Sequence, residues 1–131
     1  TLSSSSAASD VYKRQAVERA PAVCLIGDGG LQFTLPELAS AVEAQVPLIV
    51  LLWNNQGYEE IKKYMVNRAI EPVGVDIHTP DFIGVARALG AAAENVADIA
   101  QLQAALGQAV ERKGPTLIQV DQNQWQAAVL G

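Results

Sequence analysis

Short apolar runs alternate with amphipathic stretches along most of the chain. Residues 22–26 (AVCLI), 47–53 (PLIVLLW), 91–96 (AAAENV) and 116–120 (TLIQV) have the length and composition of strands. The first run ends in glycines and is apolar throughout, which predicts a strand buried on both faces. Four strands separated by helical segments predict an α/β fold, a three-layer, doubly wound, mostly parallel sheet with right-handed crossovers and helices on both faces.

The first helix is expected directly after the glycine-rich end of the first strand. Thr34 and Glu37 match a T-x-x-E capping box, and Pro36 falls in the first helical turn, where its missing N–H costs little. These signals place the helix start near Leu35 and its end at about Ala44.

An amphipathic helix is predicted over residues 57–68, after the second strand. Tyr58, Ile61 and Met65 share one stripe of this helix, as the helical repeat requires. A loop rich in proline and glycine follows at about 70–78.

Two further helices are marked by their ends. Thr79 is the expected N-cap of the third helix, and Gly90 is its expected stop. Asp98 is the expected N-cap of the fourth helix, which should run to about Arg112.

Composition narrows the class of protein. With 131 residues, half of them hydrophobic, the chain suits one domain with a sizeable core. A net charge of -5 argues against a broad nucleic-acid footprint. Cys24 is the single cysteine, so an internal disulfide and a cysteine zinc cluster are excluded, and a reducing, cytoplasmic compartment is favoured. The longest apolar run is strand-sized, so no membrane span is expected.

The first fifteen residues differ from the rest. TLSSSSAASDVYKRQ is rich in serine, has no hydrophobic periodicity and lacks the apolar centre of a signal peptide. We expect residues 1–15 to be a disordered leader, or an artefact of expression or sequence assembly, and residues 16–131 to form the domain.

Two polar stretches follow the first two strands. GDGG includes Asp28, NNQG includes Asn55, and the two residues are separated by one helix and one strand. An Asp-Gly pair alone is typical of a hairpin turn, and an Asn-Asn pair is typical of a turn or a helix cap. The helix signal after GDGG argues against a hairpin. If the two strands are neighbours, both side chains reach the carboxyl edge of the sheet, where ligands bind in such folds.

The chemistry of these stretches suits an anion and a metal ion. Glycines let backbone N–H groups approach an anion closely. Magnesium prefers oxygen ligands in octahedral geometry and commonly takes one or two carboxylates plus phosphate oxygens and water. The Asp28 carboxylate, the Asn55 amide oxygen and the Gly57 carbonyl are the candidate protein ligands.

The stretch GDGGLQFTLPELASAVEAQVPLIVLLWNNQGY resembles the thiamine diphosphate motif of 2-oxo acid decarboxylases and acetolactate synthases. The likeness covers about residues 21–120 and includes PELASA and GPTLIQV. It implies a thiamine diphosphate-binding fold that is incomplete at its N-terminus, with magnesium held on the cofactor diphosphate by the three ligands named above. Gly30 departs from the serine of some members. The cofactor-binding set implied by the resemblance is Gly27, Asp28, Gly29, Gly30, Asn55, Gly57, Tyr58 and Ile61.

Within this family, NNQGYEEIKKYM resembles 2-oxo acid decarboxylases, including those that act on a guanidino-bearing 2-oxo acid. Yeast-type pyruvate decarboxylases place a catalytic glutamate where this chain has Ile61. The neighbouring Glu60 should not replace it, because one residue turns a helical side chain by about 100°. A larger 2-oxo acid, or an acetolactate synthase-like carboligation, is therefore favoured over pyruvate decarboxylation.

The resemblance also implies what this chain lacks. In the family, the glutamate that activates the cofactor comes from a pyrimidine-binding domain of a partner subunit. We therefore expect a cofactor-anchoring part of a homo-oligomeric enzyme, with no catalytic residue of its own and no activity alone. His78 is expected in an exposed loop. A nucleotide-binding module and a non-catalytic interaction domain are the alternatives, although neither G-x-G-x-x-G nor a P-loop motif follows a strand.

Overall fold

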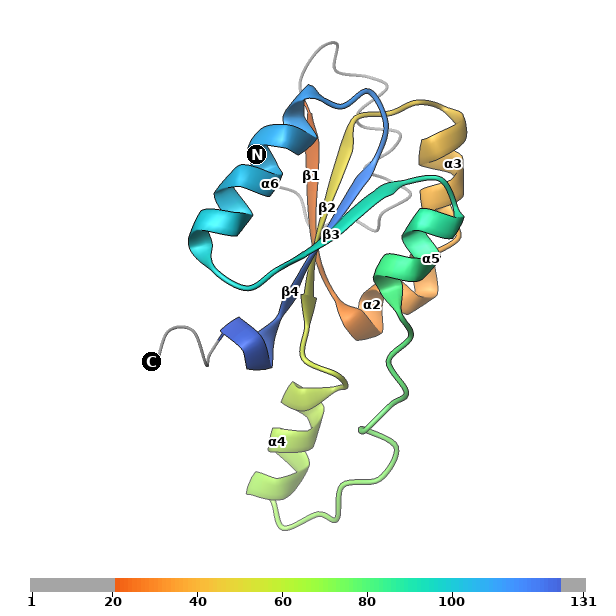
Figure 1. The fold of residues 1–131 in the computed structure, drawn as a ribbon. Coiled ribbons are helices and arrows are strands. Elements are labelled where there is room, and N and C mark those ends of the chain that lie inside the picture. The colour runs from red at the N-terminus through yellow and green to blue at the C-terminus, as the bar shows by residue number, and fades with distance from the viewer. Residues whose placement is uncertain (1–20, 126–131) are drawn as a thin grey trace.

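The computed structural model describes residues 21–125, which form a four-stranded parallel sheet (Figure 1). The strand order is β1 (Ala22–Gly27), β2 (Leu48–Asn54), β4 (Thr116–Asp121) and β3 (Ala92–Val96). Each neighbouring pair is parallel. The predicted sheet is therefore confirmed, whereas the predicted leader lies outside the described residues.

Helices cover both faces of the sheet, as predicted. The helices α2 (Asp28–Thr34), α3 (Glu37–Glu43) and α5 (Phe82–Ala88) lie on one side, and α6 (Ile99–Glu111) lies on the other (Figure 1). Two apolar clusters fill the layers between them. The first joins β1 and β2 to α2, α3 and α5, and the second joins β2, β3 and β4 to α6.

The two central strands form the most buried part of the molecule. Ile49 of β2 and Ile118 of β4 face α6, and Leu52 and Leu117 face the opposite layer, each no more than 1% exposed. Burying a side chain of this size contributes roughly 1.5–3 kcal/mol. Strand β2, which ends at the second polar stretch, is thus covered on both faces.

Strand β1 is not buried on both faces, contrary to the sequence prediction. Cys24 is buried against the first cluster, but Val23 is 50% exposed and Leu25 is 71% exposed. Among the described residues, β1 is the last strand at its edge of the sheet, and α6 covers the other end of that face. An apolar run shows that a strand can be covered, but not which element covers it.

The first helix does not begin at the predicted capping box. Helix α2 starts at Asp28, immediately after β1, and Thr34 is its last residue. Among the described residues the Thr34 hydroxyl has no hydrogen-bond partner. The backbone keeps right-handed helical angles at Leu35 and Pro36, between α2 and α3. Because proline cannot donate an N–H, the helical hydrogen bonding is interrupted there, and two short helices stand where one was expected.

One of the other two predicted caps is wrong and one is confirmed. The N-cap of α5 is Asp81, not Thr79, and its carboxylate accepts a hydrogen bond from the Gly84 N–H at 2.9 Å. The N-cap of α6 is Asp98, which accepts from the Gln101 N–H at 2.8 Å. Aspartate is among the favoured N-cap residues, and in α5 it caps the helix in place of the threonine two positions earlier.

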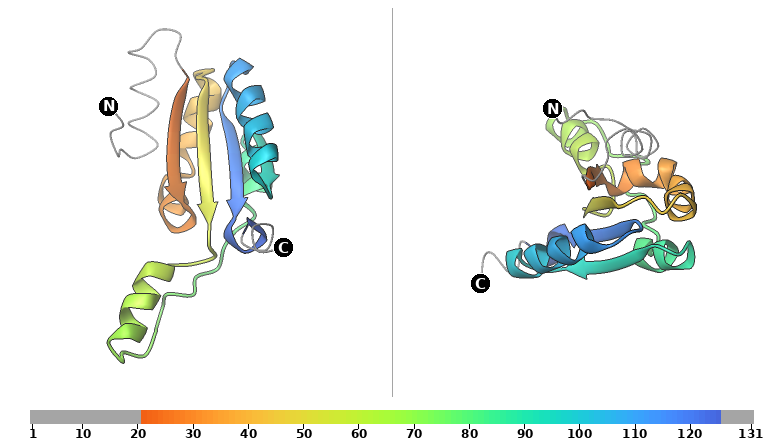
Figure 2. Two further views of the ribbon diagram at one scale, coloured as in Figure 1. Left: turned by 90° about the vertical axis from the view of Figure 1, so that its left-hand side faces the viewer. Right: turned by 90° about the horizontal axis from the view of Figure 1, so that it is seen from above.

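Helix α4 (Glu59–Asn67) projects beyond the carboxyl end of the sheet (Figure 2). We call α4 and the following residues 68–80 the arm. No residue of α4 is buried, and Ile61 of the predicted apolar stripe is 52% exposed, so the described part of the chain covers this stripe only in part. No helix in that part is long and apolar enough to cross a membrane.

Candidate functional site

The two polar stretches meet at the carboxyl ends of β1 and β2. The strands run side by side with Gly27 paired to Trp53, so the residues that follow each strand emerge together. Asp28 opens α2 and is 2% exposed. Its Oδ2 accepts a hydrogen bond from the Gly57 N–H at 2.9 Å. The expectation that both stretches reach one edge of the sheet is confirmed.

Asn55 brings its amide to the same carboxylate. The amide atom that faces Asp28 lies 3.0 Å from Oδ1 of Asp28 and 2.8 Å from the carbonyl oxygen of Gly57. With Nδ2 in this place, the amide donates to both oxygens. With Oδ1 there instead, the orientation that a metal ion would require, the amide oxygen would lie at these distances from the two other oxygens.

The two distances from the Asn55 amide, 3.0 Å and 2.8 Å, are compatible with a magnesium ion. Two ligands at right angles, each about 2.1 Å from the ion, lie about 3.0 Å apart. Asp28 is the single carboxylate of the trio. The described residues contain no group of three or more His, Cys, Asp or Glu side chains that would hold a metal by themselves. A site of this composition leaves positions for the oxygens of a bound anion.

The glycines around Asp28 are explained by close packing. A Cβ on Gly29 would lie 2.5 Å from Cε1 of Tyr58, and a Cβ on Gly57 would lie 2.8 Å from the carbonyl oxygen of Val75. At Gly30 the nearest atom, Cγ1 of Ile26, would be 3.3 Å away. Gly29 and Gly57 therefore let the two stretches and the arm approach one another.

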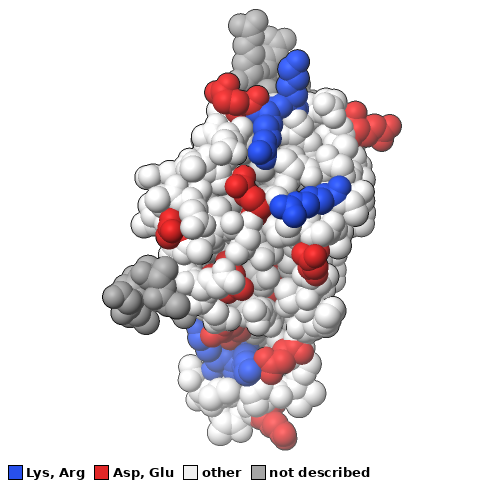
Figure 3. Space-filling view, viewed as in Figure 1, with Lys and Arg blue, Asp and Glu red and all other residues white. Residues whose placement is uncertain are grey.

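One cleft gathers the predicted cofactor residues. It has a volume of about 210 Å³, and all eight residues of the predicted cofactor-binding set line it, together with Glu59 and Glu60. The carboxylates of Glu59 and then Glu60 raise the pKa of the exposed Lys63 ammonium group. On the face drawn in Figure 3, acidic and basic groups are interspersed.

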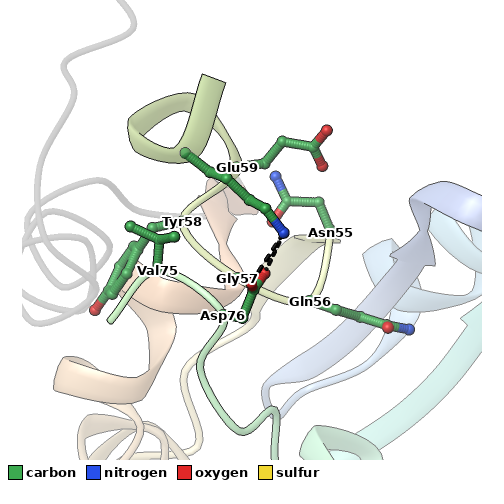
Figure 4. A pocket seen from close by; sticks show the side chains of 8 residues that line it. Asn55, Gln56, Gly57, Tyr58, Glu59, Val75 and Asp76 are labelled. Atoms are coloured by element: carbon green, nitrogen blue, oxygen red, sulfur yellow. Dashed lines mark hydrogen bonds and ion pairs between the residues drawn. The ribbon is translucent and has the colours of Figure 1, made fainter. Parts of the chain in front are cut away.

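The stretch after β2 is fixed by contacts that sequence reasoning missed. Asn54 is 6% exposed, and its Oδ1 accepts from the Gln56 N–H at 3.0 Å. The carbonyl of Val75, a buried arm residue, accepts from the Tyr58 N–H at 2.9 Å. Figure 4 shows Gln56, Tyr58 and Val75 among the residues that line a cavity of about 280 Å³ beside the cleft. Only the Asn-Asn pair gave a sequence signal, and it pointed equally to a turn.

His78 lies apart from the cleft, in the exposed loop predicted for it. Its carbonyl accepts from the side chain of Gln32 at 3.4 Å. The residue lines a separate, open cavity of about 550 Å³ with Thr79 and Asp81.

Comparison with known proteins decides the family. Residues 4–120 match the family model described as "Thiamine pyrophosphate enzyme, C-terminal TPP binding domain". The chain belongs to this family.

Individual proteins that are similar to this TPP-binding domain point to the same family. A probable 2-ketoarginine decarboxylase of Pseudomonas aeruginosa is 42% identical over 101 residues, covering 76% of this chain and 18% of the relative. An acetolactate synthase of Bacillus subtilis is 30% identical over 98 residues, covering 75% of this chain and 17% of the relative. A solved thiamine diphosphate-dependent 4-hydroxybenzoylformate decarboxylase of Rhodococcus jostii matches with a TM-score of 0.79 at 26% identity, covering 86% of this chain and 21% of that one. The chain thus spans about a fifth of the length of these proteins.

Proposed function

We propose that this domain anchors thiamine diphosphate through a magnesium ion held by Asp28, Asn55 and the carbonyl of Gly57. The observation that carries the proposal is that the Asn55 amide lies 3.0 Å from Oδ1 of Asp28 and 2.8 Å from the carbonyl oxygen of Gly57, at the end of two paired strands. Their oxygen chemistry and spacing fit magnesium, and a single protein carboxylate leaves charge to be balanced by a diphosphate. The other residues of the predicted cofactor-binding set line the cleft beside the ion.

The chain's own residues bind and orient in this proposal. Asp28 supplies the fixed negative charge, Asn55 and Gly57 complete the protein share of the coordination shell, and Tyr58 packs against Gly29 to close one wall. When bound, the cofactor supplies a thiazolium group that accepts the electrons released on decarboxylation. Catalytic acids and bases come from other segments of the complete enzyme.

The complete enzyme is proposed to be a 2-oxo acid decarboxylase, or an acetolactate synthase-like carboligase. A substrate larger than pyruvate is favoured, and a guanidino-bearing 2-oxo acid is the first candidate. Two observations support this choice. The relative with 42% identity is named for 2-ketoarginine, and Ile61, an apolar residue, lines the cleft where yeast-type pyruvate decarboxylases would present a glutamate.

The arm is proposed to dock on the pyrimidine-binding domain of a partner subunit in a homo-oligomer. Isolated helices shorter than about 12 residues are marginal in water, and α4 has 9 residues, none of them buried. Ile61, Tyr64 and Val66 are each more than half exposed, and Ile61 lies at the rim of the cleft. A partner that covers these residues would both stabilise α4 and close the cleft.

Calorimetric titration of the complete enzyme that contains this chain tests the anchoring role. We expect thiamine diphosphate to bind in magnesium and to lose at least about 100-fold in affinity in a chelator. We expect Asp28→Ala to lose affinity to the same extent even in magnesium, because the single carboxylate of the trio is removed. Such a loss corresponds to roughly 2.7 kcal/mol.

Asp98→Ala is the matched control, since it removes an aspartate from the N-cap of α6 and leaves the cleft intact. It should bind the cofactor as the wild type does, and an excess of ATP or NAD should displace nothing. Equal affinity of Asp28→Ala and wild type, or binding that is indifferent to magnesium, would overturn the proposal.

A further inference from the structure

The loop that carries Asn55 and Gly57 contains an unusual backbone conformation. Gln56, between them, has a φ of 64°, in the left-handed region that costs an L-residue roughly 1–2 kcal/mol. In Figure 4 the Gln56 side chain points away from Asn55 and Tyr58. Gln56 thus contributes to the site through its backbone.

The other left-handed residues of the same kind have an ordinary explanation. Among the described residues, only Gln45 and Ala69 are further non-glycine positions with positive φ. Each directly follows the C-cap of a helix, α3 and α4 respectively, where a left-handed residue is the common helix stop. Gln56 follows a strand, so no helix end favours its conformation.

At Gln56 the side chain of Asn54 takes the place of a helix end in stabilising the left-handed residue. It is the last residue of β2 and is buried, and its Oδ1 accepts the Gln56 N–H at 3.0 Å. An asparagine side chain that bonds the backbone two residues later forms a local turn. This bond fixes the peptide that enters the left-handed residue.

The left-handed turn in turn sets the orientation of Gly57. The peptide between Gln56 and Gly57 directs its N–H to Oδ2 of Asp28 at 2.9 Å. The Gly57 carbonyl, which belongs to the next peptide group, lies 2.8 Å from the Asn55 amide. A Gln56 that relaxed to a right-handed or extended conformation would rotate this peptide away from Asp28.

We infer that Asn54 is a positioning residue, whose side chain holds Gln56 left-handed and thereby aligns Asn55 and Gly57 on Asp28 for magnesium. The inference rests on the proposed function of that site. Asn54 itself does not touch the ion. It raises the fraction of molecules whose loop is ready to bind, and apparent affinity scales with that fraction.

The first test is a magnesium titration of thiamine diphosphate binding by calorimetry in the complete enzyme. Asn54→Ala should raise the half-saturating magnesium concentration about tenfold, which corresponds to roughly 1.4 kcal/mol. Adding Gln56→Gly to Asn54→Ala should recover roughly threefold, because glycine adopts the left-handed conformation without the steric cost. In the wild-type background the same Gln56→Gly change should alter the concentration less than about twofold, since the loop there is already in place.

The second test disfavours the left-handed conformation directly, by changing Gln56 and leaving Asn54 in place. Gln56→Val puts a β-branched residue, which resists positive φ, in the loop and should also raise the half-saturating magnesium concentration. Gln45→Val is its matched control, because it imposes the same substitution on the same conformation at the end of α3. It should lower thermal stability and leave the magnesium titration unchanged.

The outcomes separate the inference from the proposed function. If the wild type binds no thiamine diphosphate at any magnesium concentration, the anchoring role fails and the inference fails with it. If the wild type binds and Asp28→Ala does not, but Asn54→Ala titrates as the wild type, the inference alone is overturned. Equal effects of Gln56→Val and Gln45→Val on the titration would overturn it as well, since they would mark a general loss of stability.

Discussion

The centre of the sheet and the arm use the same kinds of side chain in opposite ways. Ile118 of β4 is completely buried, whereas Ile61 of α4 is 52% exposed. Val50 of β2 is 1% exposed, whereas Val66 of α4 is 56% exposed. The sheet covers its central apolar residues with helices, while the arm leaves apolar residues exposed, with Ile61 at the cleft. The sheet therefore supplies stability to this domain, and the arm presents the apolar surface that the proposed partner would cover.

The largest effect that separates the two regions should come from one substitution made in both. Ile118→Ala should lower the free energy of unfolding by about 2–5 kcal/mol, because it removes buried methylenes and leaves a cavity. Ile61→Ala should change it by less than about 0.5 kcal/mol, as exposed substitutions usually do. Urea unfolding followed by circular dichroism measures both.

Equal destabilisation of the domain by Ile61→Ala and Ile118→Ala would contradict this difference between the arm and the sheet. That result would mean that the arm packs on this chain in solution. In the complete enzyme, by contrast, Ile61→Ala should weaken subunit association, which sedimentation measures.

A second, smaller difference is expected between two glycines. Gly29→Ala should lower the free energy of unfolding by about 1–3 kcal/mol, because the new methyl group would press on the Tyr58 ring at the base of the arm. Gly107→Ala in α6 should raise it by roughly 0.5–1 kcal/mol, since a Cβ there meets open space and alanine favours the helix.

The double variant Gly29→Ala/Tyr58→Ala tests whether the Tyr58 ring is what constrains Gly29. It should cost less than the sum of its two single changes, because the clash needs both partners. Additive losses would show that Gly29 is constrained by something other than the ring.

How far the sequence predicted these features depended on the range of the interactions involved. The four strands, the order of elements and the meeting of Asp28 with Asn55 follow from local hydrophobic runs and from the rule that parallel strands end at one edge. The helix predicted from near Leu35 to about Ala44 matches α3 (Glu37–Glu43), whereas the preceding α2 was not predicted and has no side-chain cap to mark its start. The N-cap of α5 was predicted wrongly, because two nearby residues could cap it and the sequence did not decide between them.

The exposure of β1 and α4 was beyond local reasoning altogether. An amphipathic pattern says which residues favour burial, and the covering element has to be supplied by the rest of the fold or by another chain. Val75 illustrates the same limit within the site. It lies in a proline- and glycine-rich loop with no periodic signal, yet it is buried and its carbonyl binds the Tyr58 N–H.

The smallest expected effect concerns how firmly the arm is held at its base. Lys62 pairs with Asp76 at 2.7 Å and joins α4 to the returning loop, whereas Lys63 pairs with Glu59 at 3.3 Å within α4. Both pairs are exposed, so each should contribute no more than about 0.2–1 kcal/mol, less at high salt. Neither should move the global unfolding transition by much.

Local opening should nevertheless tell the two lysines apart. Lys62→Met should speed amide hydrogen exchange in α4 and at the Tyr58 N–H, because the loop that carries Val75 loses its tie to the helix. Lys63→Met, the matched control, should speed exchange within α4 alone, because Lys63 pairs with Glu59 and Glu60 inside that helix. Identical exchange at Tyr58 in both variants would mean that the buried Val75 contact holds the base of the arm without help from the ion pair, and the boundary between the sheet and the arm would then lie at Val75.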